Sequence, residues 1–266
     1  MEVEDIWVNC EFKPNNIYNV DAYKAIKKIL DKSIDCIYTD IPYKYCVAET
    51  LKPKESASSV NKRICKLFNN ELTAIKNGID YSILEDFARI CKKINCLIWC
   101  SKEQILPIMK FFVEEYSCSY NVLVWCKTNP TPMCNNQWLP DLEYCLHIRQ
   151  SGCKRMNDGY ENKSKWYVSA INKSDKDLFE HPTIKPLELV KRHLLHVTQG
   201  GDIVLDCFLG SGTTTMACKE LGRRYIGFEL EEKYCEIANN RLAGLSQQDV
   251  KLKEQGFTTI FDFGVE

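Results

Sequence analysis

The sequence lacks the features that would place it in several other classes of protein. It has no apolar run long enough to cross a membrane, and no apolar signal segment follows its acidic start, Met1 to Asp5. None of its 15 cysteines forms a Cys-x-x-Cys pair, which argues against a structural zinc site. We therefore expect a cytoplasmic protein that contacts no membrane and holds no metal ion.

A prevailing charge of one sign is also missing. The chain of 266 residues has 35 Lys and Arg against 36 Asp and Glu, which gives a formal net charge of -1. A nucleic-acid-binding protein needs a basic face rather than a basic total, so this balance neither supports nor excludes DNA as a partner.

Helical and strand patterns alternate along most of the chain. Because several of the strands are apolar throughout, the alternation indicates a mostly parallel sheet with helices on both faces, in a single domain over 1–266. The expected helices cover 21–30, 80–93, 102–115, 187–196, 213–221 and 231–242, and the expected strands cover 34–39, 95–100, 120–126, 142–148, 202–206 and 224–229.

Two polar stretches interrupt this alternation, at 44–78 and 150–180, and both are rich in lysine. Segments of such length without an apolar pattern are usually functional loops or disordered segments. We expect both to be inserts that contact DNA through the phosphate backbone, the second of them as a target-recognition element. The alternative is that their lysines form an ordinary solvated surface.

A glycine-rich loop follows the strand that ends at Asp206. Gly210 and Gly212 allow the backbone to approach a ligand closely, and Glu229 ends the next strand, where an acid commonly binds ribose hydroxyls. A dinucleotide site would have a third glycine where Thr215 stands, and a P-loop would have a lysine after the last glycine. S-adenosylmethionine, which has a ribose and an amino acid end but no phosphate, fits the loop best. The alternative is a turn that only packs a helix on a strand.

A second motif, Asp40-Ile41-Pro42-Tyr43, follows the strand at 34–39. An exocyclic amine on a nucleobase is a poor nucleophile because its lone pair is delocalised into the ring. Two acceptors, the carboxylate of Asp40 and the backbone carbonyl of Ile41 or Pro42, would bias the nitrogen toward attack. Tyr43 offers a flat face on which an extruded base can stack. Read in isolation, the motif is also compatible with an ordinary Asp-x-Pro turn.

Together these motifs resemble the amino-methyltransferases of DNA in their β-type circular permutation. That family has an acidic or polar residue, two prolines and an aromatic residue near the N-terminus, and a "HPTxKP" turn and a "DxFxGSGTT" loop near the C-terminus. Here the tetrad lies at 40–43, the turn at 181–186 and the loop at 206–214, so the resemblance covers nearly the whole chain.

The resemblance implies a Rossmann-like, doubly wound, mostly parallel sheet with an antiparallel edge strand in a circularly permuted methyltransferase fold. It implies S-adenosylmethionine as cofactor, double-stranded DNA as substrate, and a homodimer and a cognate restriction endonuclease as further partners. Asp40, Pro42 and Tyr43 would form the catalytic tetrad. The cofactor would be bound by Asp21, Asp40, Thr183, Lys185, Asp206, Phe208, Gly210, Ser211, Gly212, Thr213 and Glu229. The loop that begins at Trp125 and includes Lys127 resembles a segment over the target pocket.

The tetrad departs from the family in one position, since Ile41 stands where the family usually has proline. We expect its side chain to point away from the base, because the backbone carbonyl performs the chemistry. An Asp in the first position suggests N6 of adenine as the target. The alternatives are N4 of cytosine, an RNA or protein substrate, and a non-catalytic DNA-binding subunit that retains the fold.

Overall fold

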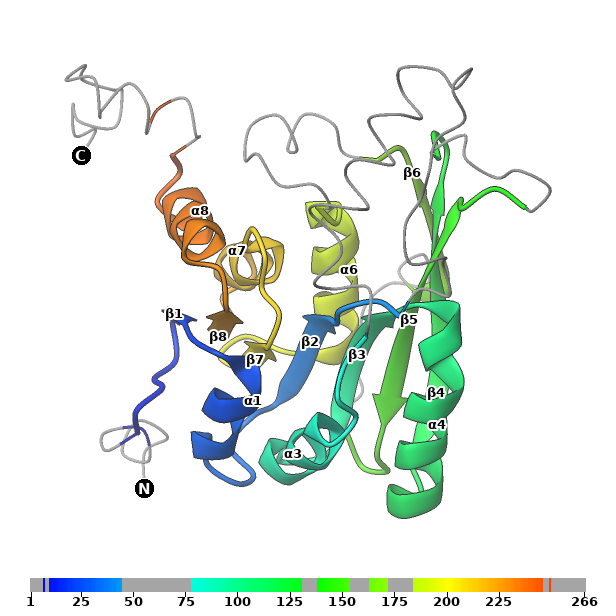
Figure 1. The fold of residues 1–266 in the computed structure, drawn as a ribbon, viewed down its shortest axis with the longest axis horizontal. Helices are drawn as coiled ribbons and strands as arrows, with labels where there is room; N and C mark the ends of the chain where they lie inside the picture. The colour runs from blue at the N-terminus through cyan, green and yellow to red at the C-terminus, as the bar shows by residue number, and fades with distance from the viewer. Residues whose placement is uncertain are drawn as a thin grey trace, which may run out of the picture.

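The computed structural model describes residue 7, residues 10–44, 78–130, 138–153, 163–171 and 184–245, and residue 249. Within these residues the strands form one sheet (Figure 1). In sheet order they are β1 (Asn16–Asn19), β8 (Arg224–Glu229), β7 (Ile203–Asp206), β2 (Cys36–Asp40), β3 (Asn95–Cys100), β5 (Leu142–Arg149), β4 (Ser119–Lys127) and β6 (Trp166–Ser169).

The fold class predicted from the alternation of elements is confirmed: the sheet is mostly parallel and its central strands are buried. All the residues of β3 and β7 are buried, as continuous apolar strands between two layers of helices require. The place of the reversed strand differs from the prediction. β5 runs antiparallel to both β3 and β4, so the antiparallel strand lies inside the sheet and not at its edge. The edges are β1 and β6, which each pair in parallel with their neighbour.

Helices cover both faces of this sheet (Figure 1). They are α1 (Ala22–Ala25), the 3-10 helix η2 (Ile26–Lys28), α3 (Ile83–Ile90), α4 (Lys102–Tyr116), α6 (Leu187–Val197), α7 (Thr213–Glu220) and α8 (Glu232–Leu242). Alternate residues of β3 enter two separate cores. Ile98 packs with α3 and α4 on one face, whereas Leu97 and Trp99 pack with α6 and α7 on the other.

Two short strands were not expected from the sequence. β1 pairs with β8 at one edge, and β6 lies within the range 150–180, which we expected to be a polar insert. β6 is four residues long with an exposed Trp166 and Val168, so neither its length nor its polarity marks it as a strand. Most of the two predicted inserts, residues 45–77, 154–162 and 172–183, lies outside the described residues.

The ends of the first insert meet beside the tetrad. A Cβ added at Gly78 would lie 3.1 Å from Cβ of Lys44 and 3.2 Å from Nε2 of Gln104. The chain therefore leaves the sheet after Tyr43 and returns to the same place at Gly78. No helix among the described residues is both long and apolar enough to span a membrane.

Candidate active site

The predicted acids end adjacent parallel strands at one rim of the sheet. Asp40 is the last residue of β2, Asp206 of β7 and Glu229 of β8, and these strands are direct neighbours. The next strand, β1, ends at Asn19 and leads into Asp21. Since parallel strands place their carboxyl ends at the same rim, the sheet brings together acids that lie far apart in the sequence. A hydrogen bond of 2.9 Å from Thr39 Oγ1 to Asp206 Oδ1 links the two motifs directly.

Backbone N–H groups hold the acids of the cofactor loop. Gly210 N donates to Glu229 Oε2 at 2.7 Å, and Glu231 N donates to Glu229 Oε1 at 2.9 Å. Phe208 N donates to Asp206 Oδ1 at 3.1 Å. The shape of the loop is thus fixed by the acids at the ends of β7 and β8.

The loop can pass close to α8 only because position 212 is glycine. Gly212 has φ +81°, and a Cβ there would lie 2.8 Å from Cβ and 3.1 Å from Cα of Ala238. Arg241, also on α8, is buried and donates to the hydroxyl of Thr213 at 3.0 Å. Ser211 is buried in the same loop, and its carbonyl accepts from Arg241 at 3.4 Å. Arg241 is a part of the loop's support that the motif did not reveal.

Burial changes the protonation of the acids in this half of the rim. Burial raises the pKa of Asp206 to about 7, an effect that the hydrogen bonds from Thr214, Phe208 and Thr39 oppose and the charge of Asp40 reinforces. Burial also raises the pKa of Glu229, against three backbone hydrogen bonds that lower it. Among the described residues, no lysine or arginine is a main cause of either shift.

We call the part of the rim around Asp206 and Glu229 the cofactor half and the part around the tetrad the tetrad half. In the tetrad half the acids form ion pairs with lysines. The ammonium of Lys185 forms an ion pair with Asp40 Oδ2 and contacts Glu143 Oε2 at 3.0 Å and the Tyr43 hydroxyl at 3.3 Å. An ammonium has three N–H donors, so these contacts use all of them. The same nitrogen lies 5.0 Å from the centre of the Trp99 ring. We predicted Lys185 among the residues that bind the cofactor; in this structure its ammonium contacts Asp40 and Tyr43 of the tetrad.

The two oxygens of Asp40 differ in their contacts. Asp40 Oδ1 is buried and has no hydrogen-bond partner among the described residues, whereas Oδ2 is bound by Lys185. A buried carboxylate oxygen without a donor is costly unless a ligand supplies one. Burial, with a further contribution from Asp40, raises the pKa of the neighbouring Cys100 thiol to about 12. The thiol therefore stays protonated and is a poor nucleophile at neutral pH.

Gln104 fixes the backbone of the tetrad, a role that the sequence did not suggest. Its Nε2 donates to the Pro42 carbonyl at 3.0 Å, and its Oε1 accepts from Ser101 N at 3.0 Å. The Ile41 N–H donates to Trp99 O at 3.2 Å and so continues the hydrogen-bond ladder between β2 and β3. In a parallel ladder the next bond would run from Ser101 N to the Ile41 carbonyl. Because Gln104 takes that N–H, the ladder ends at Ile41. The Ile41 side chain is buried in the core, as expected.

Two further predicted cofactor residues lie beside the loop. The Asp21 carboxylate caps α1 by accepting from Tyr23 N at 2.8 Å and Lys24 N at 3.2 Å. The Phe208 ring meets the Tyr23 ring edge to face, with 6.2 Å between the centroids. Thr183 lies outside the described residues.

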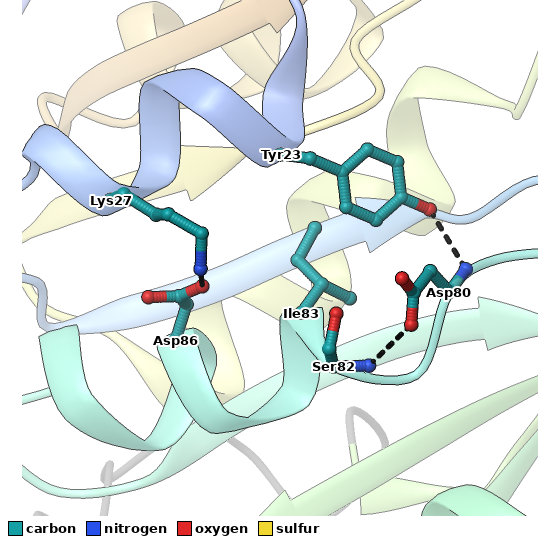
Figure 2. A pocket seen from close by; sticks show the side chains of 6 residues that line it. All are labelled: Tyr23, Lys27, Asp80, Ser82, Ile83 and Asp86. Carbon is teal, nitrogen blue, oxygen red and sulfur yellow. Dashed lines mark hydrogen bonds and ion pairs between the residues drawn. The ribbon is translucent and has the colours of Figure 1, made fainter.

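A hollow of about 270 Å³ lies on the far side of Tyr23, between α1 and the start of α3 (Figure 2). The Tyr23 hydroxyl accepts from Asp80 N at 3.0 Å, and Lys27 pairs with Asp86 at 3.1 Å (Figure 2). None of its lining residues belongs to the tetrad or the glycine loop. The Asp80 carboxylate accepts from Ser82 N at 2.9 Å, so the acids that line the hollow already have partners within it.

The glycine loop after β7, the acid at the end of β8 and the tetrad at the end of β2 lie at one rim of this sheet. Together they define an S-adenosylmethionine-dependent methyltransferase. The chain belongs to the N6/N4 family of DNA methylases, whose model matches residues 34–240. The resemblance stated from the motifs is thereby confirmed, and the chain is a DNA methyltransferase.

Curated relatives and solved structures agree with this family. The chain is 30% identical over 241 residues to the Type II methyltransferase M2.LlaDCHI of Lactococcus lactis subsp. cremoris, covering 85% of this chain and 88% of that protein. It is 32% identical over 240 residues to the Type II methyltransferase M2.MboI of Moraxella bovis, covering 85% and 86%. The crystal structure of an M1.HpyAVI–S-adenosylmethionine complex matches with a TM-score of 0.62 and 27% identity, covering 85% of this chain and 98% of that one.

The residues of the rim fit S-adenosylmethionine, which is the cofactor of this chain. Asp206 is a buried carboxylate with no lysine or arginine among the main causes of its pKa shift in the described residues, as the ammonium of the cofactor's amino acid end requires. Gly212, which has no side chain to meet Ala238, lets the loop between Asp206 and α7 pack closely against α8. When bound, the cofactor supplies an activated methyl group.

Proposed function

We propose that this protein methylates N6 of adenine in double-stranded DNA, as the modification enzyme of a restriction system. The observation that carries the proposal is Asp40 Oδ1 at the end of β2, a buried carboxylate oxygen without a hydrogen-bond partner in the part of the chain that the structure describes. A carboxylate accepts an N–H bond from the amino group and increases electron density on its nitrogen. The Type II methyltransferases that resemble this chain support the restriction context.

The tetrad would act by positioning. Tyr43 stacks on a base swung out of the duplex, which offsets part of the flipping cost of a few kcal/mol. Asp40 Oδ1 accepts one N–H of the amino group, and the Ile41 carbonyl accepts the other because Gln104 occupies the Pro42 carbonyl. The nitrogen then forms a bond to the methyl carbon as the bond from that carbon to sulfur breaks, and the nitrogen afterwards releases one proton. No side chain becomes covalently attached to the base.

The other predicted cofactor contacts belong to the same proposal. Asp206 and Glu229 would bind the ammonium and the ribose hydroxyls, and Asp21 would lie near the adenine of the cofactor. Phe208 and the loop Gly210 to Thr213 would line the site. We also propose, as the resemblance implies, that the inserts at 44–78 and 150–180 contact DNA and that the chain acts as a homodimer.

Product analysis tests the assignment to adenine. Purified protein is incubated with labelled S-adenosylmethionine and DNA of mixed sequence, and the nucleosides are separated. We expect label in N6-methyladenine, and Asp40→Ala should abolish it while cofactor binding is retained. Label in N4-methylcytosine would replace the adenine assignment with the cytosine one. The absence of cofactor binding in a calorimeter would instead favour a DNA-binding subunit without activity.

A further inference from the structure

Glu143 is the group around which the side chains of the tetrad are arranged. It lies near the start of β5, and because β5 is antiparallel to β3, the start of β5 lies at the rim where β3 ends. Its carboxylate contacts Lys127 Nζ at 2.6 Å, Lys185 Nζ at 3.0 Å and the Tyr43 hydroxyl at 3.4 Å. One carboxylate thus touches two lysines and the stacking residue.

These contacts form a chain of alternating charges, Lys127–Glu143–Lys185–Asp40. The exposed fractions of the four side chains are 14%, 19%, 10% and 31%, so the pairs are only weakly screened by solvent. Burial alone would raise the pKa of Glu143, but Lys185 and Lys127 outweigh it and lower the pKa to about 2. Glu143 is therefore ionised at neutral pH.

We propose that Glu143 is a positioning residue for methyl transfer, which holds Lys185 and Tyr43 so that Asp40 keeps an ionised, correctly oriented oxygen for the target amino group. This inference rests on the proposed function. The Lys185 ammonium is shared between two carboxylates, so Asp40 is oriented without being fully neutralised. The Tyr43 hydroxyl, which is bound by both Lys185 and Glu143, fixes the ring on which the base stacks.

Without the charge of Glu143, the arrangement changes in two ways. Lys185 would have Asp40 as its only carboxylate partner and would neutralise it more completely. Lys127 would lose its partner and remain as a second cation close to Lys185. The pKa of Lys185, which burial lowers but Asp40 and Glu143 together raise above its ordinary value, would fall. The other titratable groups that face Lys185 are Tyr43, Cys100 on β3 and Cys145 on β5.

The test compares Glu143→Gln with Glu188→Gln in the full-length protein. Glutamine keeps the size of the side chain and removes its charge. Glu188 pairs with Lys191 at 3.0 Å but is 69% exposed, so it serves as a control for the loss of an ordinary ion pair. We expect Glu143→Gln to lower the single-turnover rate by roughly 10- to 100-fold, as a misplaced reactive group does. Cofactor affinity should stay within about twofold, and Glu143→Asp should restore part of the rate.

A second readout does not depend on methylation. Protein labelled with ¹⁵N-lysine reports the Lys185 ammonium by nuclear magnetic resonance, with Lys185→Met for assignment. We expect no titration of this ammonium in the wild type or in Glu188→Gln up to the highest pH at which the protein stays folded, and a titration within that range in Glu143→Gln. An unchanged titration, a full rate in Glu143→Gln, or a parallel loss of rate, cofactor affinity and melting temperature would overturn the inference.

The two proposals fail separately in this design. If the wild-type protein methylates cytosine and Glu143→Gln methylates cytosine more slowly, the adenine assignment fails and the role of Glu143 stands. If the wild-type protein labels adenine and Glu143→Gln is equally fast, only the role of Glu143 fails.

Discussion

The tetrad half and the cofactor half of the rim satisfy their charges in different ways. In the tetrad half, Asp40 and Glu143 face the ammonium groups of Lys185 and Lys127. In the cofactor half, Asp206 and Glu229 accept hydrogen bonds from hydroxyl and backbone N–H groups, and no lysine or arginine in the described part of the chain is a main cause of their pKa shifts. The two halves lie at one rim of the sheet, and a side-chain hydrogen bond from Thr39 to Asp206 links them.

The difference indicates which half depends on its ligand. The charges of the tetrad half compensate one another, so its geometry is set before any base arrives. The cofactor half buries acids whose raised pKa values record an unfavourable environment for the charged form. A cationic ligand relieves that cost, so we expect this half to be stabilised by the cofactor and the tetrad half to be largely indifferent to it.

Exchanging the two acids for amides gives the sharpest test of the comparison. Asp40→Asn should lower the methylation rate by roughly 10²- to 10³-fold, because it removes the charge that acts on the amino group, and leave the cofactor Kd within about threefold. Asp206→Asn should raise the cofactor Kd by about tenfold, which corresponds to about 1.4 kcal/mol. Rates come from single-turnover assays and Kd values from calorimetry. If Asp40→Asn mainly weakens cofactor binding and Asp206→Asn mainly slows methylation, the proposed difference between the two halves is wrong.

The next largest effect is expected at Gly212. Alanine there combines an unfavourable φ of +81° with a contact of 2.8 Å to Ala238 Cβ, so we expect the free energy of unfolding to fall by about 2–3 kcal/mol and the cofactor Kd to rise at least about tenfold. Gly201→Ala is the matched control, since Gly201 has the same φ of +81° and nothing within 4 Å of the added Cβ. It should cost only about 1 kcal/mol and leave cofactor binding unchanged. Equal effects of both variants in denaturant titrations and calorimetry would contradict the close approach to α8.

A pH dependence of cofactor binding should follow from Asp206. With a pKa of about 7 in the free protein, Asp206 is largely protonated at pH 6 and largely ionised at pH 8. The cofactor's ammonium prefers the ionised form, so the affinity should rise by up to about tenfold per pH unit below pH 7 and level off above it. Calorimetry in two buffers should detect proton release on binding at pH 6.5, and Asp206→Asn should remove both effects.

The folding stability of the cofactor-free protein should change with pH in the opposite direction to the cofactor affinity. The folded pKa of Asp206 lies above its ordinary value of 3.8, so the folded state binds the proton more tightly than the unfolded state does. The stabilisation by this proton is present in full below pH 4 and is lost as the pH rises toward 7. Asp206→Asn should therefore be closest to the wild type in stability at acid pH, and more stable than it at pH 8.

The sequence predicted most of the sheet because its central strands have a pattern that tolerates few alternatives. The all-buried strand 95–100 was placed to the residue, and the loop between Asp206 and Thr213 followed from its glycines and acids. The edge strands β1 and β6 were missed, since four residues with partial exposure carry little periodicity. The position of the reversed strand also depends on pairing, which a single sequence does not reveal.

The supporting residues of the site were missed for a related reason. Glu143 is one charged residue in a strand, and only the antiparallel register of β5 places it at the rim. Arg241 supports the glycine loop from α8, where a basic residue in the last turn of a helix is commonplace. Gln104 stands in the first turn of α4, where glutamine also serves as an ordinary capping residue. Sequence motifs predict the residues that contact the ligand. The residues that support those side chains are identified only from the tertiary structure.

The smallest effect is expected for a substitution of Gln104. It tests how much the orientation of the tetrad backbone contributes to the rate, independently of charge. Gln104→Met keeps the length of the side chain but loses the bonds to the Pro42 carbonyl and to Ser101 N, each 3.0 Å long. Ser101 N would then be free to extend the ladder to the Ile41 carbonyl and occupy one of the two acceptors for the amino group. We expect a loss of about five- to tenfold in single-turnover rate, equivalent to about 1 kcal/mol, with cofactor affinity unchanged. Because no charge is altered, the pH dependence of the rate should match that of the wild type. A pH profile that differs from that of the wild type would mean that Gln104 acts through the charged groups and not through the carbonyl of Ile41.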